Sequence, residues 1–171
     1  MTSSVKKIPH LICPLLLAST AGHTWAPDPT LTVKTISESG AQQVLIAAEH
    51  EAEKLHAPCA IAVVDASGTL VAFLKMDGVR SGSPDLAIGK ARTSALLQRP
   101  SAETEANVDN GRLAFATAGL MTLRGGLPLK AGGQVVGAVG IASLNKDNDV
   151  TIARAAAAVF ESLSARQSPA H

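Results

Sequence analysis

Aromatic side chains and clustered positive charge are both scarce in this sequence. Trp25, Phe73, Phe115 and Phe160 are the only Trp, Phe or Tyr residues among 171, and the formal net charge is +1. No run of basic residues stands out. Proteins that bind nucleic acids need a basic surface for the phosphates or aromatic rings on which bases stack. The sequence therefore predicts no nucleic-acid partner.

Cysteine is also rare, with one residue at Cys13 and one at Cys59. If a leader containing Cys13 is removed, Cys59 is left alone and cannot form an internal disulfide. It lies in the apolar run 57–65, so a small buried side chain is its expected role. A catalytic thiol is the alternative, although no base stands near it in the sequence. Walker, GxSxG, HExxH and paired CxxC motifs are missing too, which argues against the enzyme classes that depend on them.

Hydrophobic runs are too short to span a bilayer as a helix. The nearest candidate is the apolar stretch 8–22, which follows two lysines and precedes a small residue at Ala26. A positive start, a short apolar segment and a small-residue end are typical of secretory signal peptides. Residues 1–26 are therefore predicted to be a signal peptide, and the mature protein periplasmic or secreted. A disordered N-terminal arm on a cytoplasmic protein is the alternative.

The composition of the chain is that of a folded domain. Hydrophobic residues make up 46% and charged residues 17% of the sequence, and a chain of this length is ample for one hydrophobic core. No repeat or convincing linker interrupts residues 30–165. We therefore expect one domain over 30–165, followed by a short tail at 166–171.

Residues 35–57 carry the pattern of an amphipathic helix. Thr35 and Glu38 have the spacing of a capping box. Apolar side chains recur every three or four residues, namely at Ala41, Val44, Leu45, Ala48, Ala52 and Leu55. At about 100° per residue, Ile46 and His50 fall on the opposite face, one turn apart.

The middle of the chain alternates between strand and helix signals. Residues 59–77 predict a hairpin, because two apolar runs flank an Asp-Ala-Ser-Gly turn. Residues 81–99 predict a second helix, with Ser83 as its cap and a proline at its first position. Segment 101–111 is compatible with a short polar helix or a loop, and 112–119 with a strand or a helix.

A second hairpin and a last helix complete the pattern. The strands are predicted at 127–130 and 134–142, and the helix at 147–165 with Asp147 or Asn148 as its cap. The apolar side chains expected inward on that helix are Ile152, Ala156, Val159, Phe160 and Leu163. Hairpins pair their strands antiparallel, so the predicted fold is α+β, an antiparallel sheet flanked by helices.

The strand at 134–142 contains two glycines, Gly137 and Gly140. Glycine inside a strand lowers stability, so a structural role is expected for them. Strict alternation would place Val135, Gly137, Val139 and Ile141 on one face and Val136, Ala138, Gly140 and Ala142 on the other. The second face is nearly smooth, so a helix, a second subunit or a flat ligand can come close to it. The alanine-rich stretch 155–158 is the simplest expected neighbour.

Three segments, 60–78, 87–101 and 125–143, occur in an order and spacing that resemble the HbpS/GlcG family of haem-binding or haem-degrading proteins. That family includes C-terminal domains of PduO-type proteins. The resemblance covers roughly residues 30–163. It implies a profilin-like α+β fold, homo-oligomers that are often octamers, and binding of a tetrapyrrole.

Two places depart from the pattern of that family. Thr69 stands where family members often have histidine after the turn glycine. The sequence SLNKDND at 143–149 replaces their usual small, glycine-rich continuation. We therefore do not carry over any ligand contact that relatives make at these positions.

His50 is the sharpest candidate for an iron ligand. Imidazole is a standard axial ligand of haem iron, and the resemblance implies ligation by a histidine of the first helix in PduO-type relatives. Glu53 lies three residues further on, where it could orient the ring. A solvated surface histidine is the alternative, and His56 is expected only to cap the helix.

Lys90, Arg92 and Thr93 form a signature of the same family. The two cations are candidates to pair with haem propionates or with an acidic small molecule, and the Thr93 hydroxyl is a candidate ligand contact. A plain amphipathic helix with a lysine at its edge is the alternative.

Three functions follow from these observations. The first is a haem-binding homo-oligomer that stores, senses or helps to degrade haem. The second, which the resemblance to GlcG implies, is an enzyme or accessory subunit acting on a small carboxylate such as glycolate, with Lys90, Arg92 or Arg124 as anion clamps. The third is a non-catalytic oligomeric module that senses through a partner protein.

Overall fold

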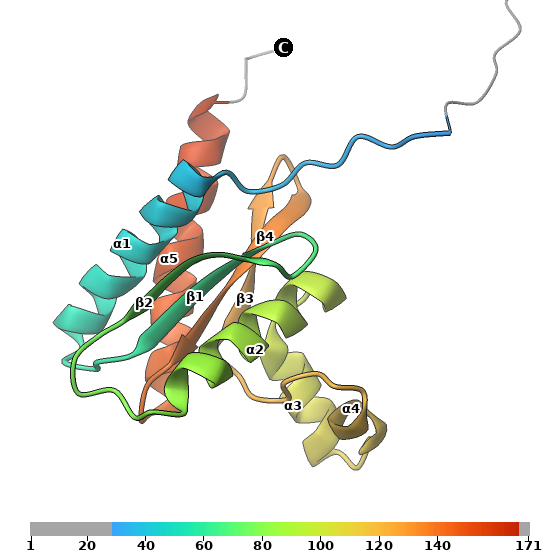
Figure 1. Cartoon of the computed structure of the whole chain (residues 1–171). Coiled ribbons are helices and arrows are strands. Elements are labelled where there is room, and N and C mark those ends of the chain that lie inside the picture. The colour runs from blue at the N-terminus through green and yellow to red at the C-terminus, as the bar shows by residue number, and fades with distance from the viewer. Residues whose placement is uncertain (1–28, 168–171) are drawn as a thin grey trace, which may run out of the picture. The chain divides into compact units, whose positions relative to one another are not determined.

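A four-stranded antiparallel sheet forms the centre of this computed structural model, which describes residues 29–167 (Figure 1). The strands are β1 (Ala60–Asp65), β2 (Leu70–Lys75), β3 (Gly126–Ala131) and β4 (Gln134–Ala142), in the order β2-β1-β4-β3. The helices are α1 (Glu38–Lys54), α2 (Ser83–Leu97), α3 (Ser101–Asp109), α4 (Ala114–Thr117) and α5 (Lys146–Gln167). Helices α1 and α5 pack against one face of the sheet and α2 against the other. The predicted α+β fold is confirmed.

Residues from Val33 onward form one compact unit, and the residues before it belong to a separate N-terminal unit. The predicted signal peptide at 1–26 lies outside the described residues. Helix α5 continues to Gln167, two residues past the boundary expected at 165. Within the part of the chain that the structure describes, no helix combines the length and apolar character that a membrane span requires.

Helix α1 buries the predicted apolar stripe but starts later than expected. Its cap is Ser37, whose Oγ accepts a hydrogen bond from the Gly40 amide at 3.1 Å. The prediction of a capping box at Thr35 is wrong, because Ile36 is buried and its amide donates to the Val136 carbonyl at 2.8 Å. This bond holds the segment before the helix alongside β4, so the helix can begin only after Ser37.

The first hairpin forms as predicted. In its turn, Asp65 Oδ1 accepts hydrogen bonds from the Ser67 amide at 2.8 Å, the Ser67 hydroxyl at 2.6 Å and the Thr69 amide at 2.9 Å. Thr69 therefore serves the turn itself, at the position where the family resemblance led us to compare it with a histidine.

The smooth face of β4 is covered by α2, which is not the helix we expected. Ala138 and Ala142 pack against the small side chains of α2, namely Ala87, Ala91 and Ala95. A Cβ at Gly140 would lie only 2.1 Å from the Ala87 carbonyl oxygen. The prediction that stretch 155–158 of the last helix packs here is therefore wrong. Close approach of α2 explains why this strand needs glycine.

The alternation along β4 is broken by a bulge near its start. Leu129 pairs with Gly137, but the next residue, Lys130, pairs with Val135, so Val136 is left without a partner. Val136 consequently packs into the core under α1 and α5, together with Val139. Its predicted place on the smooth face is wrong, because the bulge shifts the faces by one residue.

Helix α5 packs beside α1, on the face of the sheet opposite α2. Ile152, Ala156 and Phe160 are buried as predicted, whereas Val159 is 40% exposed. The cap is Asn145, whose Oδ1 accepts a hydrogen bond from the Asp147 amide at 2.9 Å. The prediction of Asp147 or Asn148 as the cap is thus wrong by two or three residues.

The remaining helices are α2, of 15 residues, and the shorter α3 and α4. Helix α2 has Gly82 at its N-cap position with no side-chain cap, so the predicted cap at Ser83 is wrong and Ser83 is the first helical residue. The ambiguous segments form α3 and α4, which contact each other and lie beyond α2 (Figure 1).

Candidate functional site

Lys90 of α2 is buried and its charge is paired inside the protein. The Lys90 Nζ lies 2.7 Å from Asp149 Oδ2 and donates a further hydrogen bond to the Ile141 carbonyl at 2.8 Å. The Lys90 and Asp149 side chains are 4% and 3% exposed. Asp149 Oδ1 also accepts hydrogen bonds from the amide and the hydroxyl of Ser143. This lysine is therefore part of a buried polar network that joins α2 to α5.

Thr93 and Arg92 differ in whether their polar side-chain atoms are available to a ligand. Thr93 is 1% exposed, and its Oγ1 accepts a hydrogen bond from the Met121 amide at 2.9 Å. Arg92 is exposed, and its Nε donates to the Gly68 carbonyl at 3.1 Å. The hydroxyl thus helps to anchor the segment after α4, whereas the terminal nitrogens of Arg92 face solvent.

His50 lies on the outer face of α1, as predicted. The residue is exposed, and Ile46 one turn earlier is 57% exposed. Within residues 29–167 the His50 ring has no hydrogen bond to Glu53. An imidazole beside an exposed aliphatic side chain offers a metal ligand next to an apolar surface.

The candidate residues do not converge on one point in a single chain. Helix α1, with His50, packs against β1, β2 and α5, whereas α2, with Lys90, Arg92 and Thr93, packs against the opposite face of the sheet. The sheet therefore separates them (Figure 1). A ligand that touched both sets would have to lie between two copies of the chain.

Arg124 is also paired with carboxylates of the protein. It forms ion pairs with Glu105 and with Asp147, the latter at 3.5 Å. The hydrogen bond from Arg124 to Glu105, together with the charge of Glu105 and then that of Asp147, raises the pKa of the guanidinium. Of the three clamps considered for an anion, only Arg92 lacks a carboxylate partner among the described residues.

Cys59 is the small buried residue that the sequence predicts. It is 0% exposed, and its Sγ lies 3.9 Å from the Met76 Sδ. Burial, followed by the charges of Asp149 and Glu49, raises the pKa of the thiol to about 12. A neutral thiol is a poor nucleophile, so the alternative of a catalytic Cys59 has no support.

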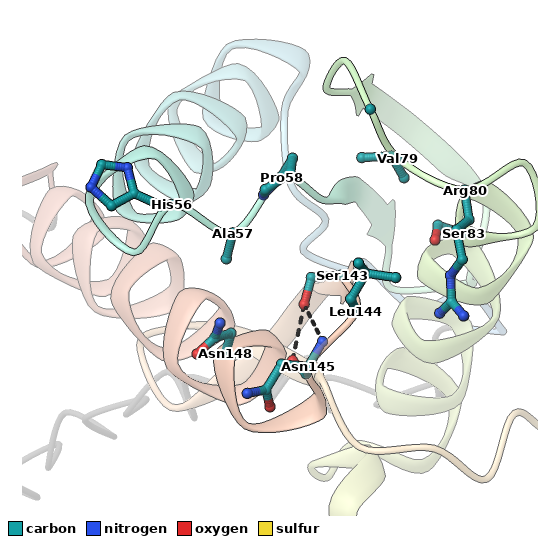
Figure 2. Close-up of a pocket in the computed structure, with 11 residues that line it drawn as sticks. His56, Ala57, Pro58, Val79, Arg80, Ser83, Ser143, Leu144, Asn145 and Asn148 are labelled. Atoms are coloured by element: carbon teal, nitrogen blue, oxygen red, sulfur yellow. Dashed lines mark hydrogen bonds between the residues drawn. The ribbon is translucent and has the colours of Figure 1, made fainter.

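A pocket of about 140 Å³ lies where the starts of α2 and α5 meet the chain that follows α1 (Figure 2). Residues from three segments line it: 56–58, 78–80 with Ser83, and 143–145 with Asn148. Sequence reasoning missed this site because the segments are far apart in the chain. One signal was present: the stretch 143–149, which departs from the family pattern, supplies one wall.

Metal ligands do not gather among the described residues. No group of three or more His, Cys, Asp or Glu side chains in residues 29–167 is placed to hold a metal ion.

Comparison with known proteins adds to this geometry. The family model described as "Haem degrading protein HbpS-like" matches residues 36–158. Protein GlcG of Escherichia coli K12 is 41% identical over 107 residues, which cover 62% of this chain and 80% of GlcG.

Solved structures give the same result. HbpS of Streptomyces reticuli, in a double-mutant form, has a TM-score of 0.72 at 30% identity, covering 78% of this chain and 93% of that one. A structure described as the PduOC:heme complex has a TM-score of 0.67 at 27% identity, covering 73% and 94%. The match of the family model over most of the domain, with the shared fold, shows that this chain belongs to the HbpS-like family.

Proposed function

We propose that this protein binds haem or a related tetrapyrrole, with His50 as the contact to the iron. The observation that carries the proposal is the exposed pair of Ile46 and His50 on α1. Two similarities support it: the family is described by haem degradation, and one structural relative was solved as a haem complex.

The donor chemistry on α1 fits such a group. The His50 imidazole supplies an axial nitrogen, and Ile46 supplies apolar surface for the edge of the ring. One protomer offers only the outer side of α1, so a flat apolar ring bound there would keep its other face in water. We therefore extend the proposal to a homo-oligomer, with an octamer as the assembly that the family resemblance implies, in which a second copy covers that face.

The residues of α2 contribute less directly to this proposal. Lys90 is paired with Asp149, so it is not available to a propionate without breaking a buried ion pair. Thr93 is buried and already accepts a hydrogen bond. Arg92 keeps terminal nitrogens free for a propionate, and because it lies across the sheet from His50, it would serve the ligand of a neighbouring copy.

The role of the bound group belongs to the same proposal. When bound, haem supplies the redox and oxygen chemistry, and the protein supplies ligation, position and shielding. Storage, sensing and assisted degradation of haem are all compatible with ligation by His50. Sensing would require a partner protein, and the signal peptide predicted for residues 1–26 favours a periplasmic or secreted site of action.

A haemin titration of the full chain tests the proposal. We expect a shifted Soret band that saturates with protein, and loss of that shift in His50→Ala. His56→Ala is the matched control, because His56 is also an exposed histidine near the same helix. Thr93→Ala tests the candidate contact on α2; because Thr93 is buried and already hydrogen-bonded to Met121, we expect it to leave the Soret shift unchanged.

Each outcome of this titration has a definite consequence. A normal spectrum in His50→Ala with a changed one in His56→Ala or Thr93→Ala would remove His50 as the ligand. No spectral shift at micromolar protein would remove the haem proposal itself. Sedimentation of the same samples tests the oligomer.

A further inference from the structure

The pocket at the starts of α2 and α5 has the walls of a small-molecule site. Its apolar side is formed by Ala57, Pro58, Val79 and Leu144. Its volume is about 140 Å³, and it is open to solvent on one side. A compact molecule, part apolar and part polar, suits such a space.

A free positive charge stands at this pocket. Arg80 lines it and has no ion-pair partner among the residues that the structure describes. The lining residues include no Asp or Glu. Three acidic residues adjoin lining residues in the sequence: Asp147 pairs with Arg124, Asp149 pairs with Lys90, and Asp77, next to Gly78, is exposed and does not line the pocket. The local charge at the pocket therefore favours an anion.

Ser83 provides an unused donor inside the same pocket. The residue is only 2% exposed, yet its hydroxyl makes no hydrogen bond within residues 29–167. In Figure 2 this hydroxyl lies on the side of Ser83 that faces Ser143 and Leu144 across the pocket. The hydroxyl is not fully enclosed by protein but borders the pocket, so it is free to donate a hydrogen bond to a molecule bound there.

The N-termini of α2 and α5, which carry the positive ends of the helix dipoles, lie at this pocket. Ser83 is the first residue of α2, which has no side-chain cap, and Asn145 caps α5. The Asn145 Oδ1 is used for that cap, and Figure 2 shows its side-chain amide turned away from Arg80 and Ser83. The first turn of α5 carries Asp147 and Asp149, whereas Asp85 in the first turn of α2 is exposed and does not line the pocket. The start of α2 is therefore the helix end that attracts an anion into the pocket.

We infer that this pocket binds a small aliphatic carboxylate. The carboxylate group would accept hydrogen bonds from Arg80 and Ser83, and the short carbon chain would lie against Val79 and Leu144. This site is separate from the proposed haem contact at His50: His56 lies at its edge with the ring turned away from it (Figure 2), and His50 does not line it.

Calorimetric titration of the full chain without haem tests this inference. The probes are propanoate, lactate, neutral propanamide and inorganic phosphate. We expect saturable binding of propanoate or lactate and none of propanamide. Ser83→Ala and Arg80→Gln should each weaken carboxylate binding by about tenfold or more, because each removes a charge-assisted hydrogen bond.

Arg154→Gln is the matched control, since Arg154 is an exposed arginine of α5 that does not line the pocket. Its affinity should equal that of the parent protein. Thermal unfolding of each variant without ligand shows whether it is folded. Stronger binding of phosphate than of either carboxylate, equal binding of propanamide, or carboxylate affinity unchanged in folded Ser83→Ala and Arg80→Gln would each overturn the inference. Failure of the haemin titration would leave it untouched.

Discussion

Lys90 and Asp149 form an ion pair of 2.7 Å that joins the two faces of the sheet. Lys90 belongs to α2 on one face, and Asp149 to the first turn of α5 on the other. The bond passes the end of β4, where Lys90 also donates to the Ile141 carbonyl. The pair therefore ties the middle of α2 to the first turn of α5.

Removal of one partner of this pair should destabilise the protein strongly. Lys90→Met leaves the Asp149 carboxylate buried without its counter-charge, and such losses cost about 3–5 kcal/mol. Denaturant unfolding monitored by circular dichroism measures the change. The double variant Lys90→Met/Asp149→Leu should recover much of the loss, because no buried charge is left. If it is as unstable as the sum of the two single variants, the pair is not coupled as described.

Gly140→Ala should also lower stability, by about 1–3 kcal/mol or more, because the added methyl group overpacks the contact with α2. The new Cβ would lie 2.1 Å from the Ala87 carbonyl oxygen, which is backbone and cannot turn aside. Gly82→Ala is the control, since a methyl group added there would meet no other atom within 4 Å. Thermal unfolding of the two variants should rank Gly140→Ala well below Gly82→Ala, and the reverse order would contradict the close packing.

Cys59 should react slowly with thiol reagents while the protein is folded. Its pKa is raised to about 12 from an ordinary 9.0, so almost no thiolate is present at pH 8. The measurement is the rate of reaction with 5,5′-dithiobis(2-nitrobenzoate) in a Cys13→Ser background, with and without denaturant. Rapid reaction of the folded protein would show that the thiol is not buried as described.

The same shift predicts a pH dependence of stability. Folded and unfolded forms both keep the thiol protonated below pH 9, so the contribution of Cys59 is constant there. Between pH 9 and about pH 12 only the unfolded form loses its proton, and the free energy of unfolding falls. Cys59→Ala should lack this part of the alkaline loss.

The lowered pKa of Asp65 should make the free energy of unfolding fall at acid pH. Partial burial alone would raise the pKa of its carboxyl, but hydrogen bonds from Ser67 and Thr69 outweigh burial and lower it below 3.8. The charged form therefore adds stability above that pH, which is lost as the pH falls through the folded pKa. Acid unfolding of Asp65→Asn should show a shallower decline than that of the parent protein, and parallel curves would contradict this.

Local patterns carried most of the fold prediction. The turn after β1 is specified by neighbouring residues, since Asp65 bonds to Ser67 and Thr69, and the buried stripe of α1 follows from its period. The two faces of β4 could not be assigned in this way. Their shift arises from the bulge opposite Leu129 and Lys130, which depends on pairing with another strand.

The site was harder to predict than the fold. Exposure of His50 follows from its place on the helix, and the structure agrees. The pairing of Lys90 could not be foreseen, because Asp149 lies 59 residues away in the chain. The pocket next to Arg80 and Ser83 depends on the meeting of three distant segments, and no single segment shows it.

The contrast between the two sides of the sheet predicts how this domain tolerates change. On the side of α1 and α5, branched side chains such as Val139 and Ile152 interlock, so one can lose a methyl group while a neighbour gains one. On the side of α2, alanines meet a glycine and the backbones nearly touch. A combinatorial library should therefore accept varied aliphatic residues on the first side, and only glycine, alanine or serine where α2 crosses β4.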